Sequence, residues 1–138
     1  MESINELLIK EHGKLLSFLI NFTKEEDKEK AKNLFDNFKW TLQKHFFVEE
    51  KAIFNFYEKI KGEEVHEIFD LMGEHGDLLE LMKFVEEDFS KDKIEDLKKL
   101  LIKHQNFEDD VFYPKLDKDL NEQQKKELIE KIKEVVRV

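Results

Sequence analysis

Two pairs of histidine and glutamate in this chain have a spacing that suits metal binding. His45 and Glu49 are four residues apart, and the same spacing separates His104 from Glu108. In an α-helix this spacing places both side chains on one face, ~6 Å apart along the axis, so that each pair can hold a cation. A cation would also offset the cost of burying two glutamates. We therefore predict that each pair supplies half of a metal site.

A longer repeat surrounds the two pairs. The segments HFFVEEKAIFNFYE, from His45, and HQNFEDDVFYPKLD, from His104, share the histidine, the glutamate, an acid directly after it and a phenylalanine soon after that. The repeat matters because 33 of the 138 residues are acidic, so a single pair at this spacing carries little weight. His66 and Asp70 form such a pair. His66 is excluded because it lies nine residues before His75, on the opposite side of a helix.

Two further histidines, His12 and His75, lie on the apolar faces of two other predicted helices. Four of the five histidines therefore lie on apolar faces of four different helices, where an uncoordinated imidazole would find few partners. This pattern favours a role as metal ligands over the alternative, in which these are core histidines whose hydrogen bonds are made by other protein groups. All four lie near the middle of their helices, so antiparallel packing would bring them to one level.

Apolar residues recur at helical spacing in four long stretches, and a shorter amphipathic stretch follows. The long stretches cover roughly residues 4–22, 27–60, 65–89 and 92–113, and Pro114 is predicted to end the last. Ser3 and Glu6 form a capping box ahead of the first. These helical stretches predict an all-α fold, and short connections between the long helices force consecutive ones to be antiparallel. We expect an up-down-up-down four-helix bundle over about residues 3–116 and a short C-terminal fifth helix over about residues 121–137, packed across the bundle or against a partner.

The composition fits this fold and excludes several classes of function. With 40% apolar residues, 41% charged residues and a single proline, residues 1–138 are predicted to form one domain of long solvated helices. The formal charge of −9 opposes binding to nucleic acid or to anionic membrane surfaces. There is no cysteine, and no apolar run approaches the ~18 residues of a membrane span. We therefore predict a cytoplasmic protein without disulfides or thiolate metal sites.

Taken together, the motifs resemble those of the hemerythrin family, specifically its HHE cation-binding (hemerythrin-like) branch. The likeness covers residues 11–114 and rests on KEHGKL around His12, HFFVEE from His45, GEHGDLL around His75 and HQNFED from His104. Carried over to this sequence, the resemblance implies that two glutamates bridge two metals and that four histidines supply nitrogen ligands. The implied ligands are His12, His45, Glu49, His75, His104 and Glu108.

The resemblance also implies the cofactor, two non-haem iron ions (Fe) with an oxo or hydroxo bridge. Manganese or a mixed metal pair would also suit nitrogen and oxygen donors without sulfur. The oxygen-carrying hemerythrins have a fifth histidine one turn before the position that matches His75, where this chain has Leu71. Their second bridge is an aspartate, for which Glu108 and Asp109 compete here. Four histidines and two glutamates leave more coordination positions open.

Three hypotheses of function follow from these expectations. The first is a protein that binds or senses O2 or a related small molecule, such as NO or peroxide, with a redox partner as a further possibility. The second is a di-iron enzyme that reduces peroxide or NO, or that aids the repair of iron centres, although repair relatives usually carry an added cysteine-bearing segment. The third is a metal-free helical interaction domain that docks through the tail helix at residues 128–136.

Three residues close to the implied ligands in the sequence are not predicted to bind metal. Glu50 and Asp109 each follow an implied bridging glutamate, and about 100° of helix rotation favours solvated surface over a place as ligands or as hydrogen-bond partners of ligands. Tyr113 is five residues past Glu108 and off the ligand face. We expect it to pack at the end of the bundle rather than to donate a hydrogen bond toward a bound oxygen species.

Overall fold

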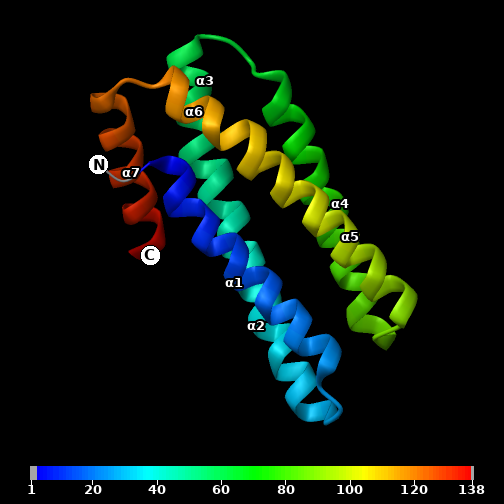
Figure 1. The fold of residues 1–138 in the computed structure, drawn as a ribbon. Helices are drawn as coiled ribbons and strands as arrows, with labels where there is room; N and C mark the ends of the chain where they lie inside the picture. The colour runs from blue at the N-terminus through cyan, green and yellow to red at the C-terminus, as the bar shows by residue number, and fades with distance from the viewer. Residues whose placement is uncertain (1–2, 138) are drawn as a thin grey trace.

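The computed structural model describes residues 3–137, with side chains as far as residue 135, and helices are its only regular secondary structure over that range (Figure 1). The predicted all-α class is confirmed. Met1, Glu2 and Val138, which belong to the predicted single domain, lie outside the described residues. Within the described part of the chain, no helix combines the length and the apolar character that crossing a membrane requires.

The first half of the chain forms a helical hairpin. It begins with α1 (Ile4–Lys24), and a short turn connects α1 to α2 (Lys28–Val48). Helical backbone then continues without a break through η1 (Glu49–Phe54), a segment with π-helical hydrogen bonding, into α3 (Asn55–Lys61). The predicted second helix, from about residue 27 to 60, is thus one continuous helical rod whose hydrogen bonding changes part way along.

The second half repeats this plan. It consists of α4 (His66–Asp88) and α5 (Lys91–Phe107), and α5 runs through a second π-helical segment, η2 (Glu108–Phe112), into α6 (Tyr113–Asp119). The prediction that Pro114 ends this helix is wrong. Pro114 lies where the hydrogen bonding changes from the π-helical pattern of η2 to the α-helical pattern of α6, and the helical backbone continues past it to Asp119.

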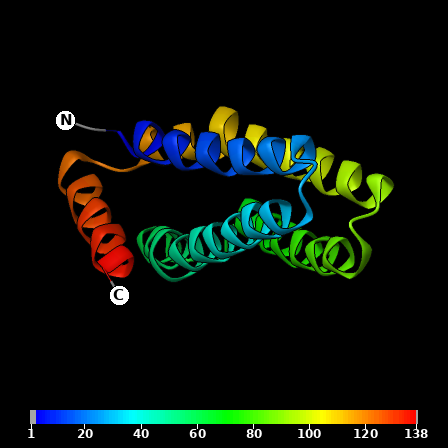
Figure 2. The same cartoon turned by 90° about the horizontal axis from the view of Figure 1, so that it is seen from below.

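The long helices alternate in direction along the chain, which is compatible with the expected up-down-up-down bundle (Figure 1). α1 packs beside α2 and α4 beside α5, while α1 also contacts α5 and α6. The tail helix, α7 (Glu122–Arg137), crosses one end of this body and contacts α2 and η1 (Figure 2).

Three apolar side chains of the tail helix that the third hypothesis would use for docking are buried inside this structure. Its apolar residues Leu128, Ile129 and Ile132 are buried and belong to the same apolar cluster as residues of η1 and α6. The side chain of Val136 lies outside the described residues. The tail helix therefore packs across the bundle and closes one end of its core.

Two apolar clusters fill the interior, with a buried polar layer between them. Along α1, Ile4 and Leu8 belong to one cluster and Leu15 and Leu19 to the other, and His12 lies between them. The same order of apolar cluster, histidine and apolar cluster recurs along the other three long helices. The buried polar residues are His12, His45, Glu49, His75, His104, Gln105 and Glu108.

The start of α1 is held by two side chains from different parts of the chain. The Ser3 hydroxyl accepts a hydrogen bond from the backbone N–H of Glu6 at 2.9 Å, as the capping box predicts. The carboxylate of Asp117, in α6, accepts hydrogen bonds from the backbone N–H groups of Ile4 at 2.9 Å and Asn5 at 3.2 Å. These N–H groups have no partner within their own helix, so Asp117 connects the start of α1 to α6.

Asp117→Ala is expected to lower the free energy of unfolding by about 1 kcal/mol, because two N–H groups at a helix start lose their acceptor. Asp77→Ala is the matched control, since Asp77 is exposed on α4 and makes no side-chain hydrogen bond or ion pair among the described residues. Urea unfolding followed by circular dichroism measures both variants. Equal stabilities would contradict the capping role of Asp117.

Candidate metal centre

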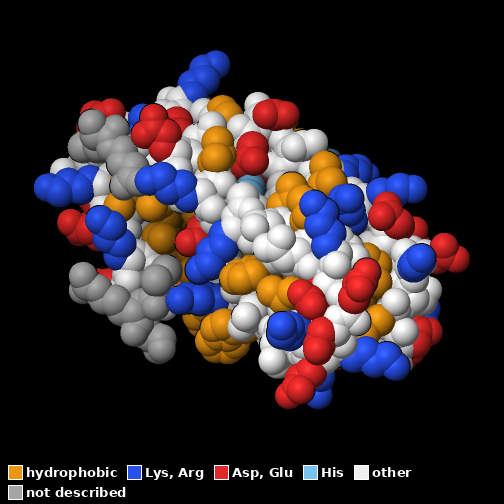
Figure 3. Space-filling view, turned by 60° about the horizontal axis from the view of Figure 1, so that its bottom comes forward, with side chains coloured by type: hydrophobic (Ala, Val, Ile, Leu, Met, Phe, Trp, Pro, Cys, Tyr) orange, Lys and Arg blue, Asp and Glu red, His pale blue; other side chains and the backbone are white. Residues whose placement is uncertain are grey.

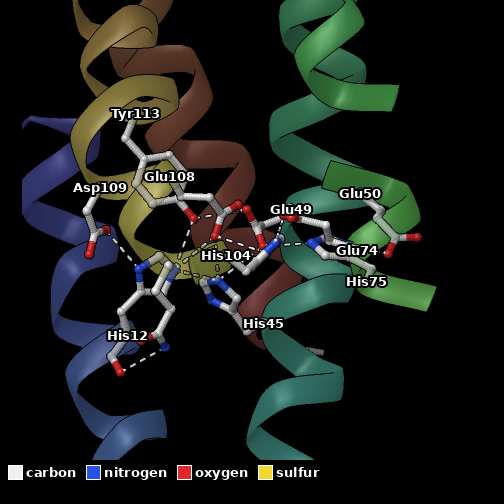
Figure 4. Close-up of polar contacts among 11 residues, drawn as sticks. His12, His45, Glu49, Glu50, Glu74, His75, His104, Glu108, Asp109 and Tyr113 are labelled. Atoms are coloured by element: carbon white, nitrogen blue, oxygen red, sulfur yellow. Dashed lines mark hydrogen bonds and ion pairs between the residues drawn. The ribbon is translucent and has the colours of Figure 1, made fainter. Parts of the chain in front are cut away.

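The six residues implied as metal ligands come together in the middle of the bundle (Figure 4). Each is at most 4% exposed, and the two glutamates are completely buried. They are His12 from α1, His45 and Glu49 from α2 and η1, His75 from α4, and His104 and Glu108 from α5 and η2. The excluded histidine, His66, lies outside this cluster, with an exposed side chain 3.2 Å from Asp70.

Glu49 lies between histidines of two helices. Its Oε1 is 3.1 Å from Nε2 of His45 and 3.3 Å from Nε2 of His75. Its other oxygen, Oε2, accepts a hydrogen bond of 2.9 Å from the hydroxyl of Tyr113. Oε2 is therefore held by a hydrogen bond, and Oε1 faces two imidazole nitrogens.

Glu108 has the corresponding position on the other side of the site. Its Oε1 is 3.1 Å from Nε2 of His12 and 3.3 Å from Nε2 of His104. Nε2 of His45 is 4.0 Å from the same oxygen. The carboxylate of Glu108 thus faces imidazole nitrogens from three helices.

Several atoms of this cluster are buried without a hydrogen-bond partner. Among the described residues they include Oε1 of Glu49, Nε2 of His75, Nε2 of His104 and both carboxylate oxygens of Glu108. Leaving a buried polar atom unpaired costs about 1–3 kcal/mol, so native proteins pair such atoms with protein, water or an ion. Imidazole nitrogens and carboxylate oxygens that face one another in this way fit a bound metal cation.

The donor atoms form two groups that share one glutamate. Within each group, the donor atoms lie within 4.8 Å of one another. The groups are Glu49, His75, His104 and Glu108, and His12, His45 and Glu108. Because Glu108 belongs to both, the arrangement fits two neighbouring cations that share a carboxylate.

Both glutamates lie at the start of a π-helical segment, a feature that the sequence analysis did not predict. η1 begins at Glu49 and η2 at Glu108. In η2 the backbone N–H of Tyr113 donates to the carbonyl oxygen of Glu108, five residues earlier. This wider turn brings residues five apart onto one face, and π-helical turns are frequent at functional sites.

The prediction that Tyr113 packs at the end of the bundle is therefore wrong. Its side chain is fully buried, and its hydroxyl donates to Glu49 inside the site. The prediction assumed α-helical rotation, which turns a residue five positions past Glu108 away from the ligand face. Burial and the nearby charges of Glu108 and Glu49 raise the pKa of the Tyr113 hydroxyl well above its ordinary value. The hydroxyl therefore keeps its proton and remains a donor.

Two acids expected on the solvated surface contact site histidines instead. Oδ1 of Asp109 is 2.8 Å from Nδ1 of His12, and Oε2 of Glu50 is 2.9 Å from Nδ1 of His75. Their side chains are 23% and 32% exposed. The favoured prediction was wrong because the rotation that turns these acids away from the clustered residues of their own helix points them at a histidine of another helix.

Sequence reasoning missed two further partners. Oε1 of Glu74 is 2.8 Å from Nδ1 of His104, and the buried Gln105 side chain donates to the backbone carbonyl of His12 at 3.1 Å. The signal for the acids is that each of the three directly adjoins a site residue in the sequence. A histidine whose Nδ1–H donates to a carboxylate keeps Nε2 free for a metal and is fixed in orientation.

Without a cation, the negative charge of the buried glutamates is balanced by protonated histidines beside them. Burial opposes the charged form of His45, but the charges of Glu49 and Glu108 outweigh it and raise the pKa of His45 to about 10. Burial also opposes the charged form of His104, yet Glu108 raises the pKa of His104 to about 9. For Glu108, contacts with Glu49 and three histidines overcome burial and lower its pKa well below its ordinary value. Metal binding must displace the imidazolium protons, so affinity should rise with pH.

A family model matches most of the chain. Residues 3–116 match the model described as the hemerythrin HHE cation binding domain. The matched range includes all six residues of the cluster. No curated protein and no solved structure matches the chain.

The raised histidine pKa values predict a pH-dependent stability of the metal-free protein. In the unfolded chain His45 and His104 titrate at about pH 6.5, so the stability that their ion pairs add to the folded state is fully present below that pH. It is lost as the pH rises through about 9 for His104 and about 10 for His45. We expect the melting temperature of the metal-free protein, followed by circular dichroism, to fall over this range. His45→Gln should weaken the fall and the exposed control His66→Gln should not, whereas a flat profile of the parent would contradict charged pairs.

Glu74→Gln is expected to weaken metal affinity by roughly tenfold or more, because His104 loses the charged acceptor that orients its ring. Glu80→Gln is the matched control at an exposed position of the same helix. Anaerobic Fe²⁺ titration in competition with a chelator measures both affinities. Equal affinities of the two variants would show that Glu74 does not support the site.

Proposed function

Because the chain belongs to the hemerythrin HHE cation-binding domain family, we propose that it is a non-haem di-iron protein that binds or senses O2 or a related small molecule, such as NO or peroxide. One observation carries this proposal. Two groups of buried imidazole and carboxylate donors share Glu108, and five of the donor atoms lack a hydrogen-bond partner among the described residues. A pair of cations would satisfy these atoms together.

In this proposal Glu49 and Glu108 would bridge two iron ions, and four histidines from four helices would supply nitrogen ligands. The position of each carboxylate between histidines of different helices supports the bridging role. Nitrogen and oxygen donors without sulfur suit iron, and also manganese. The three outer carboxylates support the proposal as well, since they hold the Nδ1 side of three of these histidines.

When bound, an iron pair supplies a redox-active centre with coordination positions open to a small ligand. The chain's own residues make room and keep the site dry. Leu71, one helical turn before His75, is fully buried and offers no donor atom. The ring of Phe46 stacks on His75 with 3.8 Å between ring centroids, and Phe54 lies nearly parallel to it at 5.8 Å. These apolar surroundings suit a small uncharged molecule such as O2 or NO.

The wider proposal concerns partners and setting. We propose a small diatomic molecule or peroxide as the ligand, and a redox partner that resets the oxidation state of the iron. We further propose that the chain forms a single domain built on an up-down-up-down four-helix bundle. We propose the cytoplasm as its location, because a chain without cysteine needs no oxidising compartment to form disulfides.

Anaerobic loading with Fe²⁺ should give about two iron ions per chain, as in other bundles with carboxylate-bridged metal pairs. Charge-transfer absorption should then appear in air. The His45→Ala and His104→Ala variants should each lose these bands, because each removes a nitrogen donor. His66→Ala is the matched control, with an exposed histidine outside the cluster, and should keep them. Reversal of the bands under vacuum would distinguish reversible binding from reduction of peroxide or NO.

The melting temperature gives an independent readout of the same proposal. A metal that binds only the folded chain stabilises it, so iron should raise the melting temperature of the parent and of His66→Ala more than that of the other two variants. Iron content near zero, with a melting temperature that iron does not change, would contradict the proposal and leave a metal-free helical domain.

A further inference from the structure

A cavity of about 430 Å³ opens between α1, α2 and α7, beside the metal centre. Small-molecule sites in proteins commonly have volumes of roughly 300–1,000 Å³ and mostly apolar walls with a few polar groups. Here the buried side chains of Leu8, Val48 and Ile132 supply apolar wall. His45, from the metal centre, also lines the cavity. The cavity is thus large enough for a small organic molecule and far larger than a diatomic molecule needs.

The charged residues of the lining are mostly cationic. Lys14, Lys44 and Lys133 all line the cavity, and Glu11 is the acid among the residues that line it. Among the described residues, none of these three ammonium groups forms an ion pair with a carboxylate, although the chain as a whole carries a charge of −9. Figure 3 shows lysine or arginine side chains beside apolar side chains on a face that includes α1 and α2. Unpaired positive charge beside an apolar wall favours an anion with an apolar body.

His45 connects this cavity to the metal centre. The other three site histidines each have Nδ1 against a carboxylate, from Asp109, Glu50 or Glu74. No such carboxylate contact is found for Nδ1 of His45 within the described part of the chain, and His45 is the site histidine that lines the cavity. A molecule in the cavity would therefore lie next to the metal centre on the side of His45.

We propose that this cavity binds a small organic carboxylate with an apolar body. The carboxylate lies near Lys14, Lys44 and Lys133, and the apolar body lies against the wall formed by α1, α2 and α7. An inorganic anion would leave the apolar wall in water, and a neutral apolar molecule would leave the lysines without a counter-charge. The site does not require metal, so its test is independent of the di-iron proposal.

Trp40 reports binding directly, because it is the single tryptophan of the chain, lines the cavity and is 68% exposed. Octanoate is the probe, and octan-1-ol is its neutral match in chain length. Titration of the metal-free protein with octanoate should shift the Trp40 emission to shorter wavelength and reach saturation, because the apolar chain removes water from the indole. Octan-1-ol should bind at least roughly fivefold more weakly, since it cannot pair with the lysines.

Two sets of variants test the charge and the space. The double variant Lys14→Glu with Lys44→Glu should weaken octanoate binding by roughly fivefold or more and leave octan-1-ol binding unchanged. Lys32→Glu with Lys83→Glu makes the same change of net charge at exposed positions away from the cavity and should bind octanoate like the parent. Thr41→Phe, which fills the cavity from its half-buried wall, should weaken binding of both probes.

The contact with His45 has its own readout. In the metal-free protein, octanoate should shift the ring ¹⁵N resonances of His45 and leave those of the exposed His66 in place. The proposal is overturned if octanoate gives no saturable change in the parent, if the alcohol binds as tightly as the carboxylate, or if the two lysine double variants lose affinity equally. Iron loading does not enter any of these outcomes, so failure here and failure of the di-iron proposal are separate results.

Discussion

The structure depends on one costly arrangement, a layer of two carboxylates and four imidazoles buried between two apolar clusters. Glu49 and Glu108 are completely inaccessible to water, and several donor atoms of the layer lack a hydrogen-bond partner. Such groups cannot lie inside a core unless opposite charge or a cation compensates them. Protonated imidazoles provide that compensation in the metal-free chain, and metal ions provide it in the proposed di-iron form. The fold is therefore organised around charge that has to be matched locally.

The bundle meets this demand by tying the helices together through the polar layer. A site residue on one helix has an acid as its sequence neighbour, and that acid contacts a histidine on another helix. Glu74 of α4 holds His104 of α5, and Asp109 of η2 holds His12 of α1. His12, His75 and His104 are thus each held at Nδ1 by an acid from another helix, so the orientation of these three rings depends on how the helices pack.

His45 is the exception, and it gives the layer a link to the surface. Its ring faces Glu49 on one side and lines the cavity between α1, α2 and α7 on the other. The tail helix is essential to this link, because Ile132 and Lys133 form part of the cavity while neighbouring residues close the core. A molecule in the cavity would therefore lie between solvent and His45.

The sequence by itself determined the all-α class, the capping box at Ser3 and the six residues of the cluster, because helical periodicity and i to i+4 spacing are local properties. The family was indicated separately, by the resemblance of four short motifs. Only the tertiary structure decided the partners of Glu50, Glu74 and Asp109 and the place of Tyr113. Those depend on which helices are neighbours and on two π-helical segments that shift the register after Glu49 and Glu108. Helical rotation of about 100° per residue tells which way a side chain turns on its own helix. It does not tell which residues of the neighbouring helix lie opposite, and those contacts decided that the three acids bind histidines of the buried cluster instead of facing solvent.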